Sequence, residues 1–216
     1  MPRNKYPEET IKKILDTSLQ LFIEKGFEQT TVLDIVDNLG GLTRGAFYHH
    51  FKSKDEVMEA IFARISKERD NFNDVMSMKG LNGQEKLKIA LKTALNANIE
   101  NEQRVAVTSL AISLLSNPRF LAEHIKGTQK DAESMAEILA DGMADGSIKK
   151  GNPKHIAELF MILVNVWMMP NIFPSSKDEW HQKAYLIEEI FTKLGYDFID
   201  EELRTLFHSI MDTIEV

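Results

Sequence analysis

The residues with the clearest chemical potential lie between positions 43 and 54. On the short helix expected there, hydrogen-bond donors occupy the outward positions: Thr43, Arg44, Tyr48 and His49. Gly45 and Ala46 lie among them, and their small side chains allow a close approach to a partner. Hydrogen-bond donors on a helix surface with small neighbouring side chains suit contact with base edges and phosphates in a DNA groove. An isolated surface arginine would be unremarkable, so the base or phosphate contact expected of Arg44 depends on the helix that carries it.

A metal site at His49-His50 is not expected. Adjacent helical residues point about 100° apart, and no second ligand pair follows at helical spacing. We expect His50 to pack beside Phe47 and His49 to face outward. The other histidines are predicted to be structural or solvated, although His124 could line a pocket: His124, His155, His181 and His208.

Enzyme signatures are missing from the sequence. It has no cysteine, phosphate loop, dinucleotide fingerprint, G-x-S-x-G motif or zinc-protease pattern. We therefore assign no catalytic residue, metal or cofactor, and the chain is not expected to be an enzyme.

Three expected helices position the donors. Residues 7–25 form the first, with one apolar face and Lys25-Gly26 at its end. Thr31 and Asp34 form a variant capping box at the start of the second, which Gly40-Gly41 ends. Thr43 caps the third, whose Phe47 and Phe51 face inward. Two short helices joined by a glycine turn and packed against another helix predict a helix-turn-helix.

The rest of the chain is also expected to be helical. Ser53 to Glu56 form a capping box that opens a long helix lasting until Asn82-Gly83, and a polar stretch from Asn96 to Gln103 marks another break. Further helix boundaries are indicated at Asn117-Pro118, Asp141-Gly142, Asp145-Gly146, Pro153, Pro170 to Ser175, Ser176 to Glu179, Gly195 and Asp200. The fold is predicted to be all-α, with an N-terminal three-helix bundle in residues 1–54 and a larger helical domain in residues 55–216.

Charge is distributed unevenly along the chain. Residues 1–54 hold 8 Lys and Arg against 7 Asp and Glu, whereas the remainder holds 18 against 26, within an overall net charge of -7. Only the first segment is therefore suited to face a phosphate backbone. No apolar run has the length of a membrane span and no secretory signal is evident, so a cytoplasmic protein with no membrane partner is expected.

The run from Thr30 to Lys54, including Thr43-Arg44-Gly45-Ala46-Phe47-Tyr48-His49-His50-Phe51, resembles the DNA-binding head of tetracycline-repressor-like (TetR family) regulators over about a quarter of the chain. The resemblance implies a homodimer on a palindromic operator and a helical domain that binds a small-molecule effector. It also implies that Tyr48 and Lys54 touch phosphate, that Thr31 caps the second helix beside the backbone, and that Arg44 and Ala46 face bases; His50 matches the family's histidine position. One departure is the Gly40-Gly41-Leu42 turn, which is one residue longer than the family's.

Apolar stripes in residues 55–216 predict an effector pocket and a dimer face. The effector is expected to be mostly apolar, and the candidate lining residues lie on inner helix faces: Phe72, Met76, Leu95, Val107, Leu110, Leu114, Met135, Leu139, Phe160, Val164 and Trp167. The dimer pair implied by the resemblance carries Ile156, Leu159, Leu163, Tyr185, Leu186, Glu189 and Ile190. Both sets could equally be buried within one chain.

These features together predict a ligand-responsive DNA-binding regulator that an effector releases from its operator. The alternative is a helical small-molecule carrier or sensor that acts through protein partners. An all-α enzyme is a third possibility that no motif supports.

Overall fold

The computed structural model describes residues 7–68 and 71–214, with side chains for residues 8–65 and 74–214. Every regular element in these ranges is a helix, as the sequence predicts. The chain divides into two compact units, Met1–Arg69 and Asp70–Val216. Within the described ranges, no single helix has the length and hydropathy to cross a membrane, although the pair Glu102–Ser116 and Pro118–Asp145, bent by 116°, meets both criteria together.

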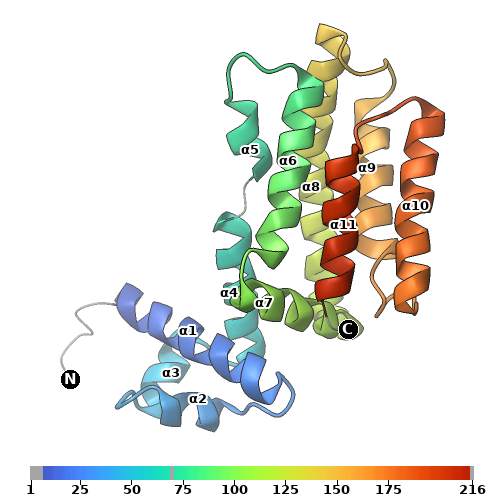
Figure 1. Ribbon diagram of the computed structural model, residues 1–216. Helices are drawn as coiled ribbons and strands as arrows, with labels where there is room; N and C mark the ends of the chain where they lie inside the picture. The colour runs from blue at the N-terminus through green and yellow to red at the C-terminus, as the bar shows by residue number, and fades with distance from the viewer. Residues whose placement is uncertain (1–6, 69–70, 215–216) are drawn as a thin grey trace. The chain divides into compact units, whose positions relative to one another are not determined.

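The first unit contains α1 (Pro7–Lys25), α2 (Val32–Asn38), α3 (Arg44–His50) and α4 (Lys54–Glu68) (Figure 1). Each helix contributes a side chain with no exposed surface: Ile14, Ile35, Phe47 and Ile61. Helix α1 packs on α2 and α4, and α2 packs on α3. The short helices are thus held by a shared apolar core, because isolated helices of this length are marginal in water.

The boundary between the units differs from the predicted one. We expected the second domain to begin at residue 55, but α4 belongs to the first unit, which ends at Arg69. The reason is burial: Val57, Met58 and Ile61 of α4 are fully buried, and α4 lies against α1. The four helices form the head together.

The turn between α2 and α3 contains two glycines in left-handed conformations. Gly40 has a φ of 58° and Gly41 a φ of 101°. Residues with a β-carbon rarely adopt such angles, and 101° lies outside even the region that asparagine tolerates. The second glycine is therefore a conformational requirement of this longer turn.

The second unit is a helical bundle, in which α8 packs on α6 and α9, and α11 packs on α6 and α10, while α7 lies across one end (Figure 1). Its helices are α5 (Asn71–Met76), α6 (Gly83–Ile99), α7 (Glu102–Ser113), α8 (Pro118–Asp145), α9 (Pro153–Ile162), α10 (Lys177–Leu194) and α11 (Glu201–Thr213). A 3-10 turn, Leu114–Ser116, precedes α8, and a π-helical segment, Leu163–Trp167, continues α9.

Several predicted helix ends are confirmed. Ser176 forms a reciprocal capping box with Glu179, Asn117 caps α8 with Pro118 in its first turn, and Asp200 caps α11. Gly195 ends α10 in a left-handed conformation. These signals are local, so sequence patterns identify them well.

The predicted breaks at Asn82-Gly83 and around Asn96 to Gln103 both occur, but the helices around them differ in extent from the prediction. The helix expected to last until Asn82 is instead divided into α4 and α5, and α5 is followed by a loop through Gly80. The break expected from Asn96 to Gln103 is narrower, because α6 continues to Ile99 and Asn101 caps α7.

Gly142, predicted as a helix end, lies inside α8. A β-carbon placed on Gly83 of α6 would lie 2.2 Å from the Gly142 Cα, so this glycine pair lets two backbones touch. Helix α8 ends at Gly146, which has a φ of 83°.

Candidate nucleic-acid interface

Phe47 sets the rotation of α3. Its side chain is fully buried and contacts the rings of Tyr48 and Phe51, with ring centroids 5.5 and 6.2 Å away. Because successive helical residues point about 100° apart, burial of Phe47 directs its neighbours to other faces. The exposed residues of this segment are Thr43, Arg44, Gly45, Tyr48 and His49, whereas Ala46 and His50 are half-buried. The predicted outward face of the helix therefore forms in the structure.

Two contacts order that face. The Thr43 hydroxyl accepts a hydrogen bond from the Ala46 backbone N–H at 3.2 Å, which caps α3. The Arg44 guanidinium lies over the Tyr48 ring, 5.6 Å from its centroid, in a cation–π contact. The guanidinium and the phenol are thus side by side on a surface open to solvent, where both can donate to an anionic or carbonyl acceptor.

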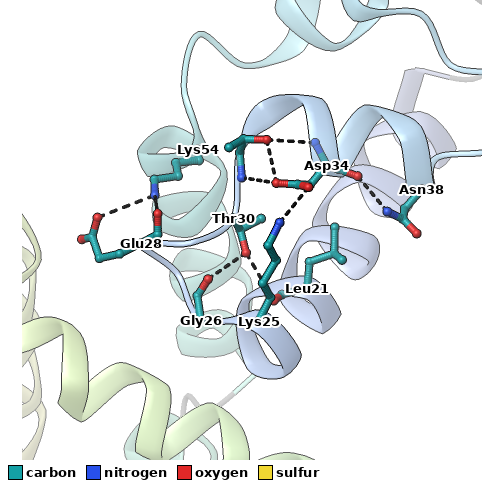
Figure 2. Close-up of polar contacts among 9 residues, drawn as sticks. Leu21, Lys25, Gly26, Glu28, Thr30, Asp34, Asn38 and Lys54 are labelled. Carbon is teal, nitrogen blue, oxygen red and sulfur yellow. Dashed lines mark hydrogen bonds and ion pairs between the residues drawn. The ribbon is translucent and has the colours of Figure 1, made fainter.

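The N-terminus of α2 is fixed by Thr31 and Asp34. The Thr31 backbone N–H donates to Asp34 Oδ2 at 2.7 Å, and the Asp34 N–H donates to Thr31 Oγ1 at 3.1 Å. Lys25 Nζ pairs with Asp34 Oδ1 at 2.7 Å (Figure 2). This ammonium and the hydrogen bonds from Thr31 hold the pKa of the Asp34 carboxyl far below its usual value. The capping role predicted for Thr31 is confirmed. The ion pair of Lys25 with Asp34 was not predicted from the sequence.

Lys54 has partners within the head. Its Nζ donates to the Phe27 carbonyl oxygen at 2.6 Å. It also donates to the Glu28 carbonyl oxygen at 3.1 Å, and the Glu28 carboxylate lies 3.7 Å away (Figure 2). The side chain is 22% exposed. The resemblance implied a phosphate contact, but two of the three ammonium donors already have acceptors in the free protein.

The candidate effector residues lie in packed regions of the second unit. Those buried are Val107, Leu110, Leu114, Met135, Leu139 and Phe160, and those half-buried are Met76, Leu95, Val164 and Trp167. The side chain of Phe72 falls outside the described ones. None of the described candidates lines either of the two cavities characterised below, because their side chains fill the interior themselves.

A groove of about 360 Å³ lies between α8 and α9. Its lining is mainly apolar, with one carboxylate: Ile125, Thr128, Gln129, Ala132, Glu158, Ile162 and Val166. A second cavity, of about 380 Å³, is lined by Pro170, Asn171, Pro174, Ser175, Ser176, Lys177, Trp180 and Ile214. His124, which we considered for a pocket, instead contacts the Asn165 carbonyl oxygen through Nε2 at 2.6 Å. The groove residues escaped prediction because the lining mixes apolar, polar and acidic side chains from α8, α9 and the π-helical segment, and apolar periodicity does not select such a mixture.

The candidate dimer residues divide between surface and interior. Leu159, Tyr185 and Leu186 are 41%, 54% and 44% exposed, which is unusual for large apolar side chains. The half-buried members are Ile156, Leu163 and Ile190. Glu189 pairs with Lys193 one turn along α10. Ile162 of α9, which the prediction omitted, is also exposed, at 52%.

The head matches a known family. Residues 14–61 match the profile of the bacterial regulatory proteins of the tetR family. The HTH-type transcriptional repressor KstR2 of Rhodococcus jostii is 27% identical over 150 residues, which is 69% of this chain and 72% of the repressor. The HTH-type transcriptional regulator SrpR of Pseudomonas putida is 43% identical over 56 residues, 26% of each chain.

Solved structures share the fold of the whole chain. A transcriptional regulator from Cytophaga hutchinsonii superposes with a TM-score of 0.62 at 18% identity, covering 97% of this chain and 100% of that one. A regulator from Saccharomonospora viridis, solved in complex with choline, gives 0.58 at 16% identity over 94% and 96%. The family consists of transcriptional regulators rather than enzymes. The exposed donor face of α3 lies in a head that carries the family's sequence pattern, so the head is a tetR-family DNA-binding domain and the chain is a DNA-binding transcriptional regulator.

Proposed function

We propose that the chain represses transcription by binding a palindromic operator as a homodimer, and that a small molecule releases it. The observation that carries this proposal is the geometry of α3: buried Phe47 turns Arg44, Tyr48 and His49 outward on a capped helix. The repressor role is supported by the name of the KstR2 relative. In the proposed complex the base-facing residues are Arg44 and Ala46, and the backbone-facing ones are Thr31, Thr43, Gly45, Tyr48, His49 and His50.

Fluorescence anisotropy with a duplex taken from upstream of the chain's own coding region tests DNA binding. Arg44→Ala is expected to reduce the preference for this duplex over a scrambled one by about 1–3 kcal/mol, the discrimination that one bidentate base contact provides. Lys150→Ala is the matched control, because it removes an exposed cation from the second unit. Equal discrimination by the wild type and Arg44→Ala would contradict the assignment. Absence of DNA binding by the wild type would favour the carrier or sensor that acts through protein partners.

The exposed apolar side chains of α9 and α10 support the homodimer. A single short recognition helix makes few base contacts, and two half-sites about 34–36 Å apart are the usual remedy. Analytical ultracentrifugation should show a dimer that Leu186→Glu dissociates. Met78→Glu is the control, since Met78 is similarly exposed, at 42%, and lies in the loop between α5 and α6, outside α9 and α10. A monomeric wild type at micromolar concentration would refute the dimer.

We further propose that the α8–α9 groove holds the effector, and that the effector is an apolar organic cation. Its volume suits a small molecule, and the Glu158 carboxylate, paired only loosely with Lys154 at 3.8 Å, provides a negative charge on an apolar wall. The choline complex of the Saccharomonospora viridis neighbour is consistent with this ligand class.

Two probes of equal length separate the effector's charge from its apolar character. Hexyltrimethylammonium is expected to raise the melting temperature and to release DNA, whereas hexanoate is not. Glu158→Gln should weaken the response, and Glu137→Gln, which neutralises an exposed carboxylate of α8 outside the groove lining, should not. An equal response to both probes would exclude a role for Glu158.

A further inference from the structure

Lys54 occupies an unusual position for a cation. It is the first residue of α4, where the positive end of the helix dipole disfavours an ammonium group. The structure compensates with two carbonyl oxygens, those of Phe27 and Glu28, and with the Phe27 ring, whose centroid lies 4.4 Å from Nζ. The ammonium therefore has a specific site within the head, on the turn between α1 and α2.

That turn controls the start of α2. Thr30 is 1% exposed, and its Oγ1 donates to the carbonyl oxygens of Gly26 at 2.7 Å and Leu21 at 3.3 Å (Figure 2). The next residue, Thr31, caps α2 and shares the Asp34 carboxylate with Lys25. A continuous set of contacts thus extends from Lys54, through the turn, to the first residues of α2.

We propose that Lys54 is a positioning residue for DNA binding: its ammonium group fastens the α1–α2 turn to the start of α4 and so fixes the α2 N-terminus, instead of neutralising a phosphate. This inference rests on the proposed DNA-binding function. It reassigns a head residue whose phosphate role was implied by the family resemblance. Without the ammonium, the Glu28 carbonyl and the Phe27 carbonyl, which also accepts from the Thr30 N–H at 3.3 Å, each lose one donor, and the turn loses a tie to α4.

The salt dependence of DNA binding separates the two roles. A phosphate contact contributes about 0.9 to the slope of log affinity against log salt, because its formation releases a counterion. Lys54→Met is expected to weaken binding about tenfold or more with the slope unchanged. Lys52→Met is the control: it removes the same charge from an exposed neighbour without touching the turn. A slope reduced by about 0.9 in Lys54→Met, or an unchanged affinity, would overturn the proposal.

Amide hydrogen exchange in the DNA-free protein tests the positioning directly. Lys54→Met should raise exchange at Thr30, Thr31 and Asp34, with α1 unaffected, whereas Lys52→Met should leave all of these protected. Unchanged protection at Thr31 and Asp34 would refute the role. Because this measurement needs no DNA, it remains decisive even if the wild type fails to bind the duplex, an outcome that would refute the proposed function instead.

A double-mutant cycle gives an independent check. Thr30→Val removes the hydroxyl that secures the same turn but leaves every charge in place. It should weaken DNA binding without altering the salt slope, and its effect should combine non-additively with that of Lys54→Met, since both act on one turn. Strictly additive effects would contradict a shared mechanism. If Lys54→Met proves unfolded by circular dichroism, Lys54→Gln, whose amide still donates to one carbonyl, replaces it in each measurement.

Discussion

Gly45→Ala should stabilise the free protein and weaken its binding to DNA. Gly45 lies in the first turn of α3 with an exposed surface, and a β-carbon there would have only the Thr43 hydroxyl within 4 Å, at 3.9 Å. Its φ is not in the left-handed region. Alanine therefore fits without strain and gains helix propensity, about 0.5 kcal/mol at this terminal position. That gain corresponds to a rise in melting temperature of about 1–2 °C for a chain of this size.

The same substitution is expected to weaken DNA binding, because the DNA must approach the helix closely at this position. If the α3 face enters a major groove, the added methyl group projects from the exposed surface, next to Arg44 and one turn before His49, and holds the helix away from the bases. We expect a loss of about 1–3 kcal/mol, similar to that of one base contact. Thermal denaturation and anisotropy on the same preparation measure both effects. If Gly45→Ala is more stable than the wild type and binds DNA equally well, Gly45 does not approach the DNA closely. If Gly45→Ala is less stable than the wild type, the claim that a β-carbon fits at this position without strain is wrong.

Three further predictions concern stability. Phe47→Ala should cost about 3–5 kcal/mol, as truncation of a fully buried aromatic ring does, and chemical denaturation of the first unit measures it. Gly83→Ala should destabilise the second unit strongly, because the new β-carbon would collide with the backbone of Gly142; a melting temperature equal to that of the wild type would contradict the close helix contact. The pKa of His208 is lowered below 6.5, first by burial and then by the charge of His181. The two Nδ1 atoms lie 2.5 Å apart, and folding therefore favours the neutral His208 ring. The stability that this provides is complete above about pH 6.5 and is lost as the pH falls through the folded-state pKa, so His208→Gln should flatten the pH dependence of unfolding in that window.

Features with local causes were predictable from the sequence. The caps at Thr31, Thr43 and Ser176 each need only a hydroxyl placed three residues before a backbone N–H. The exposed face of α3 followed from the inward placement of Phe47 and helical periodicity. Both kinds of signal are contained within a few neighbouring residues.

Features that depend on tertiary contacts were not predictable. Lys54 and Phe27 are 27 residues apart, and nothing in their spacing indicates that the ammonium lies on the turn. Gly142 was predicted as a helix end because glycine often ends helices, whereas its role in the structure is to allow close approach of the Gly83 backbone from another helix. The effector candidates were chosen for apolar periodicity, which selects core residues such as Met135 and therefore misses a groove between α8 and α9 whose lining mixes apolar and polar side chains.

The central claim is that the exposed side of α3 binds duplex DNA. Hydrogen–deuterium exchange of the full chain with and without the upstream duplex tests it most directly, with a scrambled duplex as the control. We predict DNA-dependent protection concentrated in residues 43–50 and at the start of α2, and weaker protection with the scrambled duplex. Protection confined to the second unit, with residues 43–50 exchanging as in the free protein, would contradict the account.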